Sequence, residues 1–201
     1  METIKGLKRT NYCGELRIED AGKEVTLFGW CQRQRDLGNL IFIDLRDRTG
    51  LVQLSFNDTT DREVFAKAQS VRAEYVVAAV GTVCERESKT NKIATGDIEI
   101  NVKEFRIISK AETPPFEIAK SEKVGDETTL KYRYLNLRNE KLTQNILMRH
   151  KIAKIAREYF YDNDFIEIET PMMIKSTPEG ARDYVVPSRV HNGKFYALPQ
   201  S

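Results

Sequence analysis

Residues 40–56 read LIFIDLRDRTGLVQLSF, two apolar stretches separated by a short polar segment. A period of two residues divides the first stretch into an apolar face with Ile41, Ile43 and Leu45 and a second face with Leu40, Phe42, Asp44 and Arg46. In the second stretch the apolar face consists of Val52, Leu54 and Phe56, and Gln53 lies on the opposite face. The stretch therefore predicts two neighbouring strands, each buried on one side.

The segments around this stretch predict a complete small domain between Lys23 and Ser109. VTLFGWCQR precedes the two strands, the helical segment TDREVFAKAQSVR follows them, and two further strand-like segments are EYVVAAVGTVCER and DIEINVKEFRII. Three strands, a helix and two strands are typical of a five-stranded barrel of the oligonucleotide-binding (OB) type. A split sandwich built from the same segments remains the alternative.

Beyond the barrel the pattern changes twice. Residues 110–129 carry paired prolines and several charges with little periodicity, which predicts a linker. Apolar residues from Leu142 to Phe160 then recur at three-to-four spacing, which predicts a long amphipathic helix. The segment FIEIETPMMI alternates like a strand that Pro171 interrupts, because proline cannot donate to a sheet ladder.

Composition narrows the class of protein. The 201 residues are 40% hydrophobic and 31% charged, with a net charge of +2, which describes an ordinary globular protein. No apolar run is long enough to cross a bilayer, and METIKGLKRTNY lacks the apolar centre of a secretory signal, so we expect a cytoplasmic protein. Three widely spaced cysteines and two isolated histidines predict neither a disulfide framework nor a metal site.

The second face of the barrel strands has the residue types of a nucleic-acid reader. Phe42 offers a ring to an unpaired base, a stacking contact of about 1 to 3 kcal/mol, and Gln53 offers an amide donor and acceptor to a base edge. Arg33 and Arg35 share a face with each other if their strand stays regular, although Gly29 is well placed for a bulge that would change the parity beyond it. An ordinary sheet surface with one exposed ring is the competing interpretation.

Several motifs together resemble a known family. They are YCGELR, RQRDLGNLIFIDLRDRTGLVQ, KYRYLNLR, IETPMM and TPEGARDYVVPSRVHNGKFYALPQS. The chain resembles the N-terminal part of a bacterial-type aspartyl-tRNA synthetase from about Tyr12 to Ser201, with one shorter segment near Lys89 to Ala94. The resemblance implies an OB-fold β barrel followed by the start of an α+β class II synthetase catalytic domain. The implied division is residues 1–109 for anticodon binding, 110–140 for a hinge and 141–201 for the incomplete catalytic domain.

The resemblance also implies roles for individual residues of the barrel. The positions that would contact the tRNA anticodon are Arg33, Arg35, Phe42 and Gln53, with Arg86 as a weaker candidate. The sequence departs from the family at Gln34 and Cys84, where arginines are usual, and at Asn136, where aspartate is usual. We expect these changes to keep the assignment and to shift anticodon affinity.

In the C-terminal part the resemblance implies a dimer interface and an amino-acid site. Class II motif 1 would be the helix Asn145 to Phe160 and the strand Phe165 to Pro171, with Phe160 and Pro171 at the interface of a homodimer. A helix packed on its own core fits the periodicity equally well. The loop STPEGARDYVV would close over the amino acid, with Glu179 accepting the substrate ammonium group and Ser201 beside it. A polar surface turn is the alternative.

The family reaction joins L-aspartate to tRNA(Asp) with ATP and Mg²⁺, and it needs cations that hold the phosphates. The resemblance stops before the arginine motifs that hold ATP, and the sequence contains no P-loop or dinucleotide fingerprint. We therefore expect this chain alone to bind the anticodon without complete catalytic residues and without adenylation activity. The alternatives are a freestanding single-strand-binding OB module and a sibling asparaginyl or lysyl synthetase.

Overall fold

The structure is a computed structural model that describes residues 2–177 and 183–198. The chain divides into two compact units, Met1–Thr128 and Thr129–Ser201, and each is described by itself. No helix in the described part of the chain is long and apolar enough to cross a membrane.

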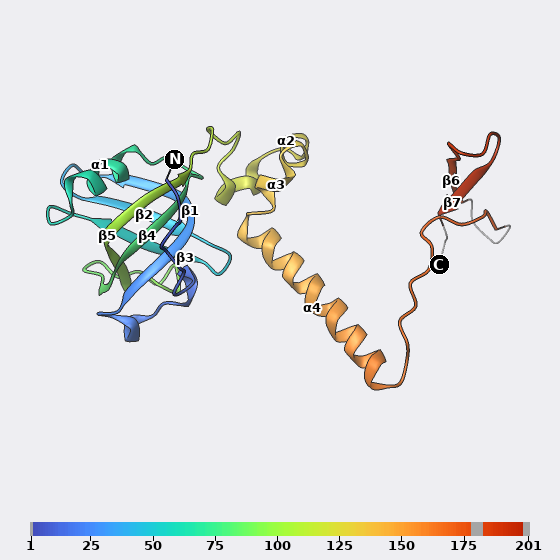
Figure 1. Cartoon of the computed structure of the whole chain (residues 1–201), viewed down its shortest axis with the longest axis horizontal. Helices are drawn as coiled ribbons and strands as arrows, with labels where there is room; N and C mark the ends of the chain where they lie inside the picture. The colour runs from blue at the N-terminus through green and yellow to red at the C-terminus, as the bar shows by residue number, and fades with distance from the viewer. Residues whose placement is uncertain (1, 178–182, 199–201) are drawn as a thin grey trace. The chain divides into compact units, whose positions relative to one another are not determined.

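The first unit is a closed five-stranded barrel (Figure 1). Its elements are β1 (Glu24–Asp36), β2 (Ile41–Arg46), β3 (Leu51–Phe56), α1 (Arg62–Ser70), β4 (Val76–Glu85) and β5 (Ile98–Ser109). The strands are ordered β1-β2-β3-β5-β4, and β1 closes the barrel by pairing with β4 over its first half and with β2 over its second half. The predicted barrel is confirmed and the split sandwich is excluded.

Alternation along the strands fills the barrel interior. Ile41, Ile43 and Leu45 of β2 are fully buried, and so are Val52, Leu54 and Phe56 of β3. Phe56 and Phe105 meet edge to face at the centre, with ring centroids 5.1 Å apart. Because the barrel is filled by side chains, any ligand must be met by its outer surface.

Helix α1 is fixed at both ends by side chains. Asp61 caps its N-terminus by accepting hydrogen bonds from the backbone N–H groups of Glu63 and Val64. At the other end, Nε2 of Gln34 donates to the carbonyl oxygens of Ala68 and Gln69 at 2.9 and 3.1 Å. Gln34 of β1 therefore holds the helix against the barrel.

The irregularity in β1 lies beyond Gly29. The register between β1 and β2 shifts between Cys31 and Arg33, whereas Gly29 pairs regularly with Val77 of β4. A Cβ at Gly29 would overlap the carbonyl oxygen of Arg46, so this glycine permits the close approach of β2. The prediction of a bulge at Gly29 is wrong, because the irregularity lies about three residues later. It lies just after the point where β1 changes its partner strand from β4 to β2.

A buried ion pair joins β2 to the turn before β4. Nη2 of Arg46 donates to both carboxylate oxygens of Glu74 at 2.8 and 2.7 Å, and Nη1 reaches Oε1 of Gln32 at 3.3 Å. Glu74 has a positive φ of 65°, and its N–H donates to the carbonyl oxygen of Cys31. These contacts hold the strand irregularity at Gln32 in one conformation.

The turn between β2 and β3 anchors the N-terminal segment through Asp47. Oδ2 of Asp47 accepts from the N–H of Cys13 at 2.7 Å, and Oδ1 accepts from the N–H and hydroxyl of Thr49. Burial by itself would raise the pKa of Asp47, but these donors outweigh it, so the pKa lies below its ordinary value. The carboxylate therefore stabilises the folded state while it is ionised.

We expect Asp47→Asn to lower the free energy of unfolding at neutral pH by about 1 to 3 kcal/mol, because a buried N–H loses its acceptor. Since the folded pKa is depressed, the contribution of Asp47 is full above the unfolded pKa of about 3.9 and is lost as the pH falls through the folded value. Urea unfolding at neutral pH and near pH 3 measures both effects. Asp58→Asn, at an exposed position, is the control. Equal urea midpoints for Asp47→Asn and the wild type would refute this role.

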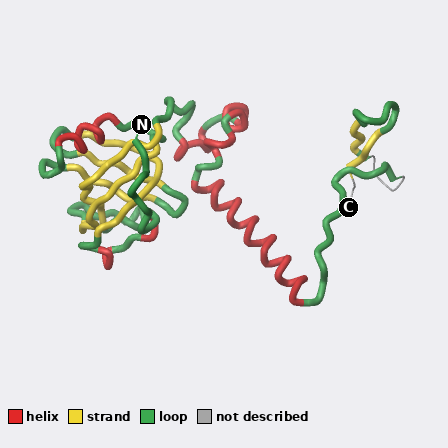
Figure 2. The backbone as a smooth tube through the Cα atoms, in the orientation of Figure 1, coloured by secondary structure: helices red, strands yellow, loops and turns green. Residues whose placement is uncertain are grey.

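Short helices lead from the barrel into the second unit (Figure 2). They are η3 (Ile118–Lys123), α2 (Asp126–Lys131) and α3 (Arg133–Asn136), so the segment predicted as a linker contains helical turns. The second unit continues with α4 (Glu140–Asp162), β6 (Tyr184–Pro187) and β7 (Phe195–Leu198). Strands β6 and β7 pair antiparallel, and Ile174 forms a bridge with Ala197.

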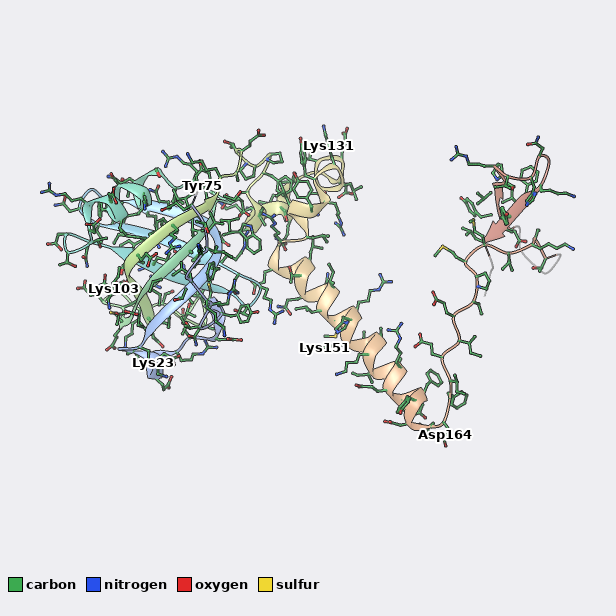
Figure 3. The ribbon with its side chains drawn as sticks, viewed as in Figure 1. Lys23, Tyr75, Lys103, Lys131, Lys151 and Asp164 are labelled. Atoms are coloured by element: carbon green, nitrogen blue, oxygen red, sulfur yellow. The ribbon has the colours of Figure 1, made fainter. Side chains whose placement is uncertain are left out.

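Helix α4 confirms the predicted long helix and leaves its apolar side chains uncovered. Asn139 caps it by accepting from the N–H of Lys141, and none of its residues is buried. Figure 3 labels Lys151 along this helix and Asp164 just after it. The exposed apolar side chains are Ile146, Leu147, Met148, Ile152, Ile155, Tyr159, Phe160 and Tyr161. This unit therefore encloses little of its apolar surface by itself.

The predicted strand from Phe165 to Pro171 is not formed. These residues belong to no helix or strand, and Ile166 and Ile168 are 86% and 77% exposed. A strand exists only where a second strand satisfies its backbone groups, and no segment in the described ranges pairs with this one. The alternating pattern of apolar and polar residues was therefore not sufficient to predict a strand in this segment.

Candidate nucleic-acid interface

One row of side chains crosses all five strands on the outside of the barrel. The pairs Arg33–Asp44, Asp44–Gln53, Gln53–Glu99 and Glu99–Cys84 are direct register partners. We call these five residues the central row. Their strand neighbours point inward, as Ile43, Leu54 and Ile100 are fully buried. Closure of the barrel thus lines up residues that are far apart in the sequence.

A second row runs beside the central row and carries the aromatic ring. It consists of Arg35, Phe42, Ser55, Asn101 and Thr82, which are again register partners in order. Phe42 is half-buried on the outer surface, with the guanidinium carbon of Arg35 5.3 Å from its ring centroid. The prediction that Phe42 faces away from Ile41 and Ile43 is confirmed.

Arg33 and Arg35 also share the outer surface, although their strand is not regular as that expectation required. The register shift comes before both, so it changes their parity together. Arg33 is exposed, whereas Arg35 is partly covered by its contacts. Gln34, between them, has the opposite parity and binds the end of α1. The side chain of Gln34 is therefore engaged with α1, and its expected effect on anticodon affinity stays a prediction.

Gln53 lies at the centre of a hydrogen-bonded network. Its Oε1 accepts from Nη2 of Arg35 at 2.9 Å and from Nη2 of Arg86 at 2.6 Å. Its Nε2 donates to Oε2 of Glu99 at 2.7 Å. The residue lies on the predicted face but is only 3% exposed, and its contact with a base edge stays a prediction. A ligand must replace one of these partners to contact the amide.

Two acidic residues of this site were missed by sequence reasoning. Asp44 accepts from Nη2 of Arg35 at 2.9 Å, and Glu99 accepts from Gln53. The two-residue strand period places Asp44 on the outer face. No local sequence pattern indicates that Glu99 lies in the same row, on the far side of Gln53. The site thus has three guanidinium groups, from Arg33, Arg35 and Arg86, against two carboxylates. This mixture suits hydrogen bonding to bases as well as attraction of phosphates.

The other predicted site residues belong to the second unit of the chain. Glu179 and Ser201 lie outside the described residues. Phe160 is 52% exposed at the end of α4, where its ring packs edge to face on Tyr159 and Phe165, and Pro171 is exposed. Asn136 is buried at the end of α3. Within residues 2–177 and 183–198 no group of histidine, cysteine and acidic side chains could hold a metal ion.

The three thiols differ in accessibility. Burial, reinforced by Asp47, raises the pKa of Cys13 above its ordinary value, and burial, reinforced by Asp44 and Glu74, raises the pKa of Cys31 to about 12. Cys84 of the central row is only partly buried, with Sγ 3.6 Å from the carbonyl oxygen of Thr82. The row thus carries a thiol that solvent can reach.

We expect an aromatic disulfide reagent to modify one thiol of the folded protein rapidly, because burial covers Cys13 and Cys31 and raises the pKa of both, whereas Cys84 is partly exposed. Absorbance of the released thiolate measures the count and rate, and Cys84→Ser should abolish the rapid phase. The remaining two thiols should react only in denaturant. Rapid modification of Cys13 or Cys31 in the folded chain would contradict the burial described above.

Comparison with protein families finds two matches. Residues 25–108 match the family described as OB-fold nucleic acid binding domain. Residues 125–201 match the family described as tRNA synthetases class II (D, K and N). The first match covers the five strands and both rows of the outer face.

Curated relatives are similar over the whole chain. An aspartate–tRNA ligase of Ruminiclostridium cellulolyticum is 56% identical over 202 residues, and an aspartate–tRNA(Asp/Asn) ligase of Caldanaerobacter subterraneus is also 56% identical. Each alignment covers 100% of this chain and 34% of the relative. The chain therefore spans about a third of the length of the curated relatives it matches.

Solved structures of aminoacyl-tRNA synthetases are similar to this chain in fold. The asparaginyl-tRNA synthetase of Pyrococcus horikoshii with asparaginyl-adenylate has a TM-score of 0.81 and 27% identity, covering 97% of this chain and 43% of that one. An aspartyl-tRNA synthetase described as putative, from Leishmania major, has a TM-score of 0.84 and 23% identity, covering 100% and 41%. The second shares the fold at an identity too low to indicate more.

Proposed function

We propose that this chain belongs to the class II aminoacyl-tRNA synthetases, in the group of the aspartate–tRNA ligases. The whole protein attaches L-aspartate to tRNA(Asp) in an ATP-dependent reaction, and the barrel contributes by binding the anticodon loop. The proposed division is residues 1–109 for the anticodon domain, 110–140 for the hinge and 141–201 for the start of the catalytic domain. A protein with this role in translation works in the cytoplasm.

The observation that carries this proposal is the ring of Phe42 beside the network of Gln53 on the outside of a filled barrel. An unpaired base gains about 1 to 3 kcal/mol by stacking on such a ring. Arg33 and Arg86 supply donors to phosphates or base edges on either side. Paired helical RNA presents no such free base surface, so a loop is the form of RNA that fits.

Recognition at Gln53 takes place by exchange of partners. The amide already has two donors on its oxygen and one acceptor on its nitrogen, so a base edge takes the place of Arg35, Arg86 or Glu99. A base that cannot replace the lost hydrogen bond leaves a buried polar group unpaired, which costs about 1 to 3 kcal/mol. This penalty makes the exchange selective for base identity.

The second unit contributes the start of the aminoacylation site. From the family resemblance, Glu179 accepts the ammonium group of L-aspartate and Ser201 lies beside it. ATP and Mg²⁺ belong to the whole enzyme, and no residue of this chain is assigned to them. Phe160 and Pro171 belong to the interface of a homodimer, which the exposed apolar side chains of α4 support.

We expect the chain to bind the anticodon stem-loop of tRNA(Asp) more tightly than a stem-loop with a shuffled anticodon, and Phe42→Ala to weaken the first complex roughly tenfold or more. Fluorescence anisotropy with labelled RNA at fixed salt measures both. Phe28→Ala is the matched control, because Phe28 is a half-buried ring of β1 outside both rows. Equal affinity for all anticodons would favour a freestanding single-strand-binding module instead.

We expect the purified 201-residue chain to catalyse no aspartate-dependent exchange of pyrophosphate into ATP. Adenylation needs a site that excludes water around charged phosphates, and the apolar side chains of α4 and of residues 165–173 are exposed. The ³²P-pyrophosphate exchange assay measures this, with a full-length aspartate–tRNA ligase as the positive control. Exchange above background that depends on aspartate would refute it.

A further inference from the structure

We propose that Asp44 is a positioning residue for the anticodon-binding face, acting by holding the guanidinium group of Arg35 between Phe42 and Gln53. This inference rests on the proposed function of the barrel. Oδ1 of Asp44 lies 2.9 Å from Nη2 of Arg35, and the side chains are 28% and 35% exposed. The pair is therefore partly shielded from water, where a charge-assisted hydrogen bond is stronger than at an open surface.

Arg35 links the aromatic ring of Phe42 to the amide of Gln53. Its Nη2 donates both to Asp44 and to Oε1 of Gln53, and its guanidinium carbon lies over the ring of Phe42. Its Nε is buried without a hydrogen-bond partner. Since a buried donor without an acceptor costs about 1 to 3 kcal/mol, the contact with Asp44 is needed to keep the guanidinium group in this place.

The position of Arg35 determines which part of the Phe42 ring and which atoms of Gln53 an incoming base can contact. With the guanidinium group over the ring of Phe42, an incoming base stacks on the part of the ring that Arg35 leaves open. The same guanidinium group fixes the direction of the Gln53 oxygen, which Arg86 also contacts. A face arranged in advance loses less side-chain entropy on binding, so affinity for the matching base increases.

Electrostatics alone predicts the opposite role for Asp44. RNA is a polyanion, so replacing a carboxylate on its binding face by a neutral amide should strengthen binding and make it more salt-dependent. A positioning role predicts weaker and less selective binding for the same substitution. The two effects have opposite signs, so a single substitution separates them.

The test compares Asp44→Asn with Glu24→Gln in the whole chain. Glu24 also lies on the barrel and pairs with Lys103 at 2.9 Å, but both side chains are 61% exposed and neither belongs to the two rows. Each substitution removes one negative charge, so the net charge of the protein changes equally, whereas only Asp44 lies in the central row. Affinities are measured for the anticodon stem-loop of tRNA(Asp) and for a loop with one substituted anticodon base, at two salt concentrations.

We expect Asp44→Asn to lower the affinity for the tRNA(Asp) loop about tenfold. The affinity for the substituted loop should change by less than about twofold, so the selectivity between the two loops falls. Glu24→Gln should preserve the ratio of the two affinities. Asp44→Glu keeps the charge on a longer side chain and should restore part of the selectivity. Urea unfolding of each variant shows whether the barrel is intact, and Asp44→Glu takes the place of Asp44→Asn if the latter is unfolded.

A double-mutant cycle with Arg35→Ala tests whether Asp44 acts through Arg35. If Asp44 acts through Arg35, Asp44→Asn should change affinity by less than twofold once Arg35 is alanine. An equal loss in both backgrounds, or tighter binding of the tRNA(Asp) loop by Asp44→Asn, overturns the inference and leaves the proposed function intact. If the wild-type chain shows no preference for the tRNA(Asp) loop, the proposed function fails, and the inference fails with it.

Discussion

Closure of the barrel through β1 is the constraint on which the rest of this structure depends. The strand pairs with β4 through its first half and with β2 through its second half, and Trp30 is where the partners change. Closure leaves each residue of a strand only two directions, into the filled core or out to solvent. Hence the outward residues of five strands form ordered rows, and chemistry that is scattered in the sequence becomes one surface.

That surface is polar and largely satisfied by its own contacts. Gln53 is almost completely covered, yet the groups that cover it are arginines and a carboxylate, which hydrogen-bond to nucleic acids as readily as to one another. Such a face differs from an open patch of positive charge. Binding replaces hydrogen bonds that already exist, so the free energy gained depends on how well a base reproduces them.

The second unit, unlike the barrel, leaves most of its large apolar side chains exposed. Helix α4 has no buried residue, and the segment after it exposes Ile166 and Ile168. The curated relatives are about three times as long as this chain, and an apolar helix face gains stability only when other residues cover it. The barrel, by contrast, buries its own core and has the features of a unit that folds alone.

The sequence by itself determined the order of strands and helix along the barrel domain, the long helix and the outward placement of Phe42, because strand and helix periods are local properties of the chain. The outward placement of Arg33 and Arg35 depends on the register shift that precedes them in β1. Only the tertiary structure decided that Gln53 is enclosed, that Gln34 binds α1, and that Glu99 stands beside Gln53. These facts depend on the register between strands up to 46 residues apart, which no local pattern encodes. For the same reason the predicted strand at residues 165–171 failed: a strand is defined by its partner, and none of the described residues pairs with it.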